Sequence, residues 1–196
     1  ALYRWAGAVK AHQAGMLDPF SVASHLLNHN LGLFNTFVLL FSSLTMAMAV
    51  HYAAEQNRKM LIRMLALTWI FGLAFLVIKG IEWRADYYEG LIPALNWNPV
   101  ETLIHKGYDP TNVNLAHLQM YFVIYFCMTG LHAIHMVIGL GVVFWVGWLA
   151  SKGHFEGGND QPVEILGLYW HFVDIVWVFL FPLLYLIAGS PPSVGH

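Results

Sequence analysis

The chain has 196 residues, of which 58% are hydrophobic, 15% are aromatic and only 10% are charged. Ordinary soluble domains carry about 25% charged residues, so this composition predicts an integral membrane protein. The net charge is −2 and no basic block is present, which excludes the clustered positive surface that nucleic-acid binding needs. The single cysteine, Cys127, cannot form a disulfide within the chain and is expected to be a small buried side chain.

Residues 1–30 form a mixed polar and aromatic segment without a hydrophobic span. The segment starts at Ala1 rather than at a methionine, and it contains no recognisable signal peptide. We therefore expect a polar N-terminal segment here, and we expect that sequence preceding it has been processed away or left out.

Four hydrophobic stretches follow, at about 31–54, 61–83, 116–150 and 165–188. Each reaches the roughly 20 residues that an α-helix needs to cross a bilayer, so the predicted fold is an all-α membrane bundle of four transmembrane helices. The third stretch exceeds that length and is expected to be tilted or to project from the membrane. Residues 189–196 are expected to be a C-terminal tail.

Small residues on these spans predict close helix packing, because they let neighbouring backbones approach one another. In the first span they are Ser42, Ser43, Thr45, Ala47 and Ala49, and in the third span they are Gly130, Gly139 and Gly141. We expect the first span to be packed against neighbours rather than isolated.

The loops predict an orientation. The short connection after the first span carries Arg58, Lys59 and Arg63, whereas residues 84–114 balance their two basic residues with acidic ones. Positive charge in short loops favours the cytoplasmic side, so residues 84–114 are expected to be extracytoplasmic. Arg58, Lys59 and Arg63 are interpreted either as a topological anchor or as a site for an anionic phospholipid headgroup.

Ionisable side chains within the spans are the candidate functional residues, because such groups need protein or water around them. His171 and Asp174 are three positions apart in the last span and are predicted to pair with each other. His132 and His135 have the same spacing in the third span. Together with His171 they suggest either a metal or haem site, or hydrogen-bonding groups of a packed interior.

The packed-interior interpretation is favoured for these histidines, because no cysteine pair or carboxylate cluster completes a familiar ligand set. Glu82, near the end of the second span, is interpreted as a structural group paired with Lys79, or as part of a proton or lipid-headgroup site. We predict a polar interior that includes His132, His135, His171, Asp174 and Glu82, with no catalytic, cofactor or metal residue in this chain.

Several motifs in this order and spacing resemble subunit III of the haem-copper oxidases, the cytochrome c and quinol oxidases. The most specific is YWHFVDIVW at 169–177, which resembles the last-helix signature of that family. The string TGLHAIH at 129–135 resembles its Thr-Gly-x-His-x-x-His helix. Weaker matches are LFSSLT at 40–45 and LALTWIFG at 65–72, which resemble the middle helices of the bacterial five-helix form. KGIEW at 79–83 is similar to the family's segment in which a glutamate precedes an aromatic residue.

The resemblance implies a subunit that binds no haem or copper itself and supports a partner that reduces O2 to water and pumps protons. It implies oxidase subunits I and II as partners, with haem and copper in the catalytic subunit, and it implies bound phospholipid and a bacterial inner membrane location. A larger respiratory supercomplex is compatible with the same resemblance. The family's much-discussed glutamate lies on a helix preceding residues 31–54, so that role is carried over to no residue here, including Glu82.

Two other classes of function stay open at this point. One is a haem-binding membrane cytochrome that uses His132 or His135 with His171. The other is a small transporter or proton channel, for which ionisable residues within the membrane are also expected.

Overall fold

The computed structural model describes residues 22–23, 29–93, 96–105, 108–109, 111, 113–155 and 160–186. Most of the predicted N-terminal segment, 1–30, and the whole predicted tail, 189–196, lie outside the described residues. All structural statements below concern the described part of the chain.

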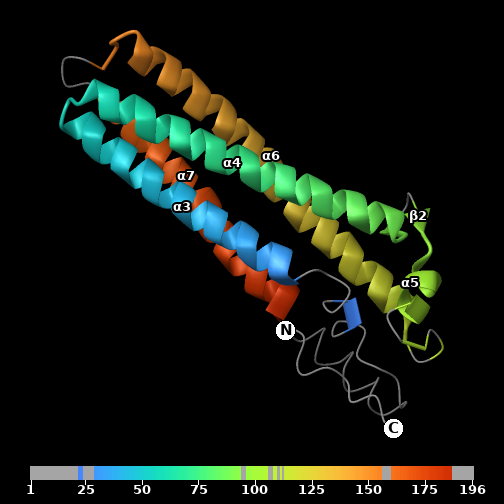
Figure 1. Ribbon diagram of the computed structural model, residues 1–196. Coiled ribbons are helices and arrows are strands. Elements are labelled where there is room, and N and C mark those ends of the chain that lie inside the picture. The colour runs from blue at the N-terminus through green and yellow to red at the C-terminus, as the bar shows by residue number, and fades with distance from the viewer. Residues whose placement is uncertain are drawn as a thin grey trace. The chain divides into compact units, whose positions relative to one another are not determined.

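Four long helices dominate this part (Figure 1): α3 (His29–Ala54), α4 (Arg58–Tyr88), α6 (Leu115–Ser151) and α7 (Gln161–Phe181). Each is long and apolar enough to cross a membrane. In hydrocarbon a spanning segment must satisfy its backbone groups internally, and a helix does so. The predicted all-α membrane fold with four spanning helices is confirmed.

One of these helices extends clearly beyond the hydrophobic stretch read from the sequence, because α4 begins at Arg58 and continues past Trp83 to Tyr88. α6, with 37 residues, matches the long third stretch to within one residue at each end. The extra turns of α4 carry Glu82 and Asp86, which are only 3% and 6% exposed. Their burial explains why the charges at the end of the hydrophobic stretch do not end the helix.

The connection between α4 and α6 contains structure that the sequence did not predict. Strands β1 (Leu91–Ile92) and β2 (Asn96–Trp97) pair antiparallel, and the short helix α5 (Pro99–His105) follows. Gly90 starts the turn with a φ of 68°, a left-handed conformation that favours glycine. The Thr102 hydroxyl donates to the Glu89 carbonyl at 2.7 Å and ties α5 to the end of α4.

Farther along the connection, Asp109 begins a small turn of the Asx type. Thr111 donates to Asp109 Oδ1 from its hydroxyl at 2.7 Å and from its backbone N–H at 2.9 Å. These bonds, the hydroxyl bond foremost, favour the carboxylate and hold the pKa of Asp109 below its usual value.

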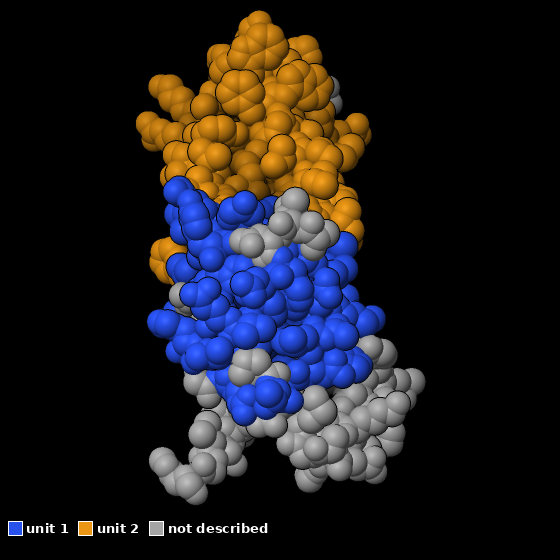
Figure 2. Space-filling view, turned by 90° about the vertical axis from the view of Figure 1, so that its right-hand side faces the viewer, with its two compact units in different colours: residues 1–32, 81–129, 180–196 blue, residues 33–80, 130–179 orange. Residues whose placement is uncertain are grey.

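The chain divides into two compact units, which Figure 2 shows in different colours. Unit 1 comprises residues 1–32, 81–129 and 180–196, and unit 2 comprises residues 33–80 and 130–179. Unit 2 is therefore built from segments of all four long helices. Unit 1 contains the connection described above, together with the ends of α4 and α7 and the first half of α6.

Unit 2 is organised around the indole of Trp170, which is fully buried. A Cβ atom at Gly72 would lie 2.9 Å from the Trp170 ring, and one at Gly139 would lie 3.0 Å from it. Both α4 and α6 thus present a glycine where the large ring of α7 needs room. The expected packing role is confirmed for Gly139 but is wrong for Gly141, where an added Cβ would meet no described atom within 4 Å.

The first span is packed as predicted, through one of its small residues. Ser42 of α3 is fully buried, its hydroxyl accepts a bond from Trp170 Nε1 at 3.0 Å, and it donates to the Thr68 carbonyl at 3.4 Å. Thr45 and Thr68 add a hydroxyl–hydroxyl bond of 2.8 Å. Three helices are therefore joined by one short chain of polar contacts.

Cys127 is exposed on α6, so the expected buried role is wrong. It lies two positions after Tyr125 and two before Thr129, and both of those residues are buried. Two residues along an α-helix correspond to a rotation of about 200°, which directs Cys127 away from the packed face.

Replacing Gly72 by Ala should destabilise the protein by about 1–3 kcal/mol, because the new methyl group overpacks the space filled by Trp170. Gly80→Ala is the matched control on the same helix, since an added Cβ there meets nothing within 4 Å. The control should be neutral or stabilising, as alanine is the better helix former. Denaturant unfolding in detergent measures both, and equal stability of the two variants would contradict the packing account.

Candidate functional site

The most specific motif, 169–177, lies on α7, and four of its residues form the buried face of that helix. Trp170, Val173, Asp174 and Trp177 are each no more than 3% exposed. Their spacing of three, four and seven positions places them on one side of a helix. The motif is therefore first a packing surface, within which Asp174 is the only carboxyl group.

The predicted direct pair of His171 and Asp174 is wrong. His171 Nδ1 shares a 2.7 Å hydrogen bond with the Ser43 hydroxyl of α3. Ser43 also interacts with the Asp174 carboxyl group, yet neither Asp174 oxygen has a hydrogen bond of normal geometry among the described residues. The prediction failed because spacing along one helix says nothing about a hydroxyl that a second helix supplies.

His132 lies in an aromatic enclosure on the inner side of α6. Its ring centroid is 5.5 Å from that of Phe75 and 5.1 Å from that of Trp177, and the residue is 4% exposed. Phe75 meets Trp177 edge to face at 4.8 Å. No described residue bonds His132 Nε2. The predicted interior position of His132 agrees with this geometry.

Trp177 also receives a cation and a hydroxyl partner. The Lys79 ammonium nitrogen lies 5.0 Å from the centroid of its ring, within the range of a cation–π interaction. Its indole N–H donates to the Thr36 hydroxyl at 3.2 Å. Lys79, which is 2% exposed, is thereby held inside unit 2 at a depth where an ammonium group needs protein around it.

His135 does not join this interior. It is exposed, and its Nδ1 bonds the Leu131 carbonyl of its own helix at 2.8 Å. Tyr169 of α7 donates to the backbone carbonyl of His135 at 3.0 Å, not to its ring. Placing His135 in the polar interior was therefore a wrong prediction for this chain's own bundle.

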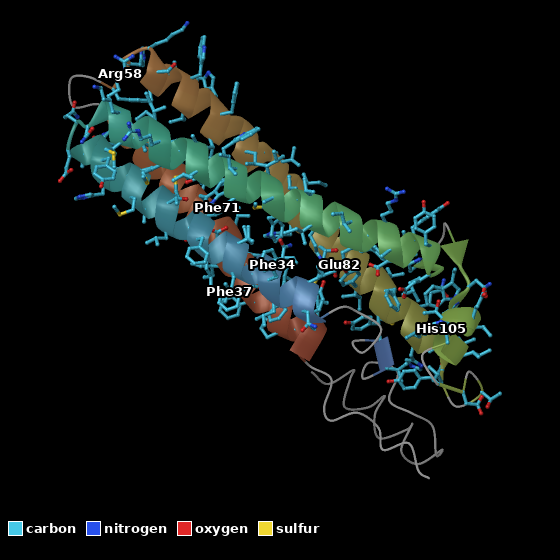
Figure 3. The ribbon with its side chains drawn as sticks, in the orientation of Figure 1. Phe34, Phe37, Arg58, Phe71, Glu82 and His105 are labelled. Carbon is cyan, nitrogen blue, oxygen red and sulfur yellow. The ribbon has the colours of Figure 1, made fainter. Side chains whose placement is uncertain are left out.

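Unit 1 holds a second polar centre, which we call the carboxylate–phenol cluster: Glu82, Asp86, Tyr121, Tyr125 and Tyr185. Glu82 Oε1 accepts from the Tyr125 hydroxyl at 3.0 Å and also from the Tyr185 hydroxyl. The two phenol oxygens are 3.4 Å apart. The buried carboxyl group of Glu82, which Figure 3 labels on α4, thus links α4 to α6 and to the segment that follows α7.

The segment that follows α7 brings Tyr185 to this cluster. Pro182 has no backbone N–H to continue the α-helical pattern, and the chain continues as a π-helical turn, Pro182–Leu186. Tyr185 lies on that turn, and the Leu184 carbonyl of the same turn accepts a hydrogen bond from the Tyr121 hydroxyl. A widened turn is therefore held by two tyrosines of α6.

Sequence reasoning found Glu82 but missed its partners. Asp86 is one turn after Glu82, and Tyr125 is one turn after Tyr121, so each pair shares a helix face. The spacing of four residues within each pair could have indicated that its two polar side chains lie on one face of a helix. Their meeting was not predictable, because Tyr125 and Tyr185 are 43 and 103 positions from Glu82.

The basic residues of the first connection lie where α4 begins. Arg58 donates to the Ser151 carbonyl at the end of α6, so it caps that helix (Figure 3). Lys59 and Arg63 are exposed, and Arg63 reaches the Met60 sulfur at 3.8 Å. Arg58 therefore has a structural bond, while Lys59 and Arg63 face outward.

The described residues include no group of three or more histidine, cysteine or acidic side chains placed to hold a metal ion. His132 is enclosed by carbon rings, His171 is bonded to Ser43, and His135 lies on the surface. The candidate site is accordingly a set of polar contacts that joins helices.

Comparison with known proteins connects this four-span bundle to the respiratory oxidases. The sequence model of the family "Cytochrome c oxidase subunit III" matches residues 106–189. Cytochrome c oxidase subunit 3 of Cyprinus carpio is 32% identical over 169 residues, which are 86% of this chain and 51% of that protein. The probable quinol oxidase subunit 3 of Staphylococcus aureus strain USA300 is 27% identical over 169 residues, 85% of this chain and 72% of that protein.

The chain spans about half the length of the fish relatives that it matches. The fold and the polar interior define a multi-pass helical membrane protein, and the matched region includes both histidine-bearing motifs. The resemblance read from the motifs is confirmed: the chain is similar to subunit III of the haem-copper oxidases.

Ser43→Ala should cost about 1 kcal/mol of stability, because it removes the bond to His171. Asp174→Asn should be close to neutral, since it replaces a buried ionisable group at nearly constant shape while no normal hydrogen bond is lost among the described residues. Thermal unfolding of the purified protein compares them. Greater damage from Asp174→Asn would show that the carboxylate has a strong partner.

Tyr185→Phe should destabilise the protein by about 1–3 kcal/mol, because it removes one of the phenol donors to Glu82 inside the bundle. Tyr88→Phe is the control, since Tyr88 is 71% exposed and its change should stay within about 0.5 kcal/mol. Limited proteolysis should cut the variant faster after Phe181. An unchanged unfolding free energy and cleavage rate would rule out a structural role for the carboxylate–phenol cluster.

Proposed function

We propose that this chain is the non-catalytic subunit III of a terminal haem-copper oxidase in the bacterial inner membrane. In this role it supports a partner subunit that reduces O2 to water and pumps protons. The observation that carries the proposal is its similarity, over most of its length, to subunit 3 of both a cytochrome c oxidase and a quinol oxidase.

The contacts of the interior polar side chains favour a structural role for this chain over a catalytic one. Glu82, His132 and His171 are each engaged by neighbouring side chains, and these contacts join one helix to another. Haem and copper are assigned to the partner oxidase subunit I, with subunit II as a further neighbour. A larger respiratory supercomplex is a compatible setting for the same subunits.

The outer surface offers apolar area for such partners. Phe34, Phe37 and Phe41 of α3 are 58%, 52% and 57% exposed. Three aromatic rings at helical spacing form a stripe that must be covered by lipid or by another transmembrane helix. In this proposal the connections 55–57 and 152–160 face the cytoplasm and residues 84–114 face outward.

The two other classes of function are not favoured. A haem would need an accessible imidazole nitrogen in a space of its own size, and the His132 ring is enclosed by Phe75 and Trp177. A transporter of the known types is built from internal repeats or broken helices. α3 and α4 are continuous helices through their whole length.

An affinity-tagged copy of this chain, expressed in its native host and solubilised in mild detergent, should co-purify with a subunit that carries haem and copper. We expect the eluate to show a Soret absorption band and oxygen consumption with a reduced electron donor. Mass spectrometry of the eluate identifies the partners. Recovery of the chain with no haem-containing protein, under conditions that keep the native oxidase intact, would contradict the proposal.

A further inference from the structure

The carboxylate–phenol cluster holds two carboxyl groups inside unit 1, one helical turn apart. Glu82 and Asp86 are four positions apart on α4, so their side chains are neighbours on one helix face. They are only 3% and 6% exposed. Two carboxylates held together away from water repel each other, and such pairs share one proton instead of both ionising. The same helix carries one buried cation, Lys79, which balances only one of two negative charges.

Phenol groups from two other segments face this pair. Tyr121 and Tyr125 come from α6, and Tyr185 comes from the turn that follows α7. The Asp86 carboxyl group lies close enough to act electrostatically on all three phenols. Because Glu82 Oε1 accepts a hydrogen bond from two of them, both carboxyl groups belong to one connected set of side chains.

The hydrogen bonds of the cluster suit both protonation states of the Glu82 carboxyl group. An ionised carboxylate only accepts hydrogen bonds, and here Tyr125 and Tyr185 donate to it. A protonated carboxyl group also donates, and a phenol oxygen accepts that bond when its own hydrogen turns elsewhere. The two phenol oxygens are 3.4 Å apart, and either can donate to the other. A proton can therefore be added or removed while these oxygens stay in place.

A polar pocket of about 450 Å³ lies at the end of α4 beside this pair. The residues that line it are Tyr88, Glu89, Gly90, Asn98, Glu101, Thr102 and His105. Tyr88, at its wall, is 71% exposed, so water reaches the pocket. The Glu89 N–H donates to the Ala85 carbonyl at 2.9 Å, so the helical turn continues to Glu89. Asp86 is three positions earlier and is therefore its neighbour on the helix.

We propose that Glu82 and Asp86 together bind one exchangeable proton, which reaches them from water in the polar pocket. One O–H bond forms at a carboxylate oxygen as one O–H bond of a hydronium ion breaks, and no electron is transferred. Tyr125 and Tyr185 are positioning residues, because their hydroxyl groups hold the Glu82 carboxyl group in either state. The inference concerns this chain's own side chains and does not depend on the proposed oxidase function.

Infrared difference spectroscopy tests the proposal on the purified protein with the subunits that co-purify, cycled between acidic and alkaline buffer. A protonated carboxyl group shielded from water gives a C=O stretching band of its own, which shifts in D2O. Every sample carries Asp174→Asn, which removes the other buried carboxyl group among the described residues. We expect a band equivalent to one proton per chain that is present at acidic and neutral pH and lost at alkaline pH.

Variants assign this band to the pair. The double variant Glu82→Gln and Asp86→Asn should abolish it, whereas Glu101→Gln, which removes an exposed carboxyl group of α5, should leave it unchanged. Asp86→Asn alone should remove most of the band at neutral pH. In that variant the remaining carboxylate keeps its two phenol donors and has lost its like-charged neighbour.

Tyr185→Phe should keep the band but move it to higher frequency, because a C=O group that loses a hydrogen-bond donor vibrates faster. Tyr88→Phe, which alters an exposed phenol, is the control and should not move it. Circular dichroism checks that each variant keeps its helices. If the double variant does not fold, the comparison of Tyr185→Phe with Tyr88→Phe decides the assignment.

Three results would overturn the proposal. The first is an identical pH-dependent spectrum for the protein with and without the double substitution. The second is a band of undiminished area in Asp86→Asn at neutral pH. The third is the same band position in Tyr185→Phe and Tyr88→Phe. None of these readouts uses oxidase activity, so their failure is distinguishable from failure of the proposed function.

Discussion

The insertion of the Trp170 indole between the glycines of two other helices is the contact on which the rest of unit 2 depends. Gly72 of α4 and Gly139 of α6 leave the space, and Ser42 of α3 accepts the indole N–H. One side chain of α7 thereby touches all three other helices. Lipid tails provide no hydrophobic drive for helices to associate, so close packing and a few buried hydrogen bonds must do it.

The same constraint explains the polar interior. A hydroxyl, imidazole or carboxyl group inside a bundle needs protein partners, because hydrocarbon supplies none. Ser43 meets His171, Trp177 meets Thr36, and Glu82 meets two phenol groups, each time from a different helix. In this interpretation the ionisable residues, which first suggested catalysis or metal binding, form contacts that hold specific helices together.

Predictions from the sequence succeeded where the structural feature depends on one contiguous segment. Hydropathy located the four helices, and motif order indicated the family to which the chain is similar, because span length and local strings are properties of contiguous residues. The predictions failed where a contact depends on two segments that are far apart in the sequence. His171 lies near Asp174 on its own helix, yet its partner is Ser43, 128 positions away. Likewise the second interior carboxyl group, Asp86, lies in a segment that was interpreted as a charged loop, because burial in the folded chain is invisible to a hydropathy window.

The central proposal is that this chain holds helices and neighbouring subunits in place while the metals belong to another subunit. Quantifying iron and copper in each subunit, after the purified complex is separated under mild conditions, tests it most directly. The account predicts that both metals remain with the partner and that this chain carries neither. Stoichiometric iron or copper bound to this chain alone would contradict it.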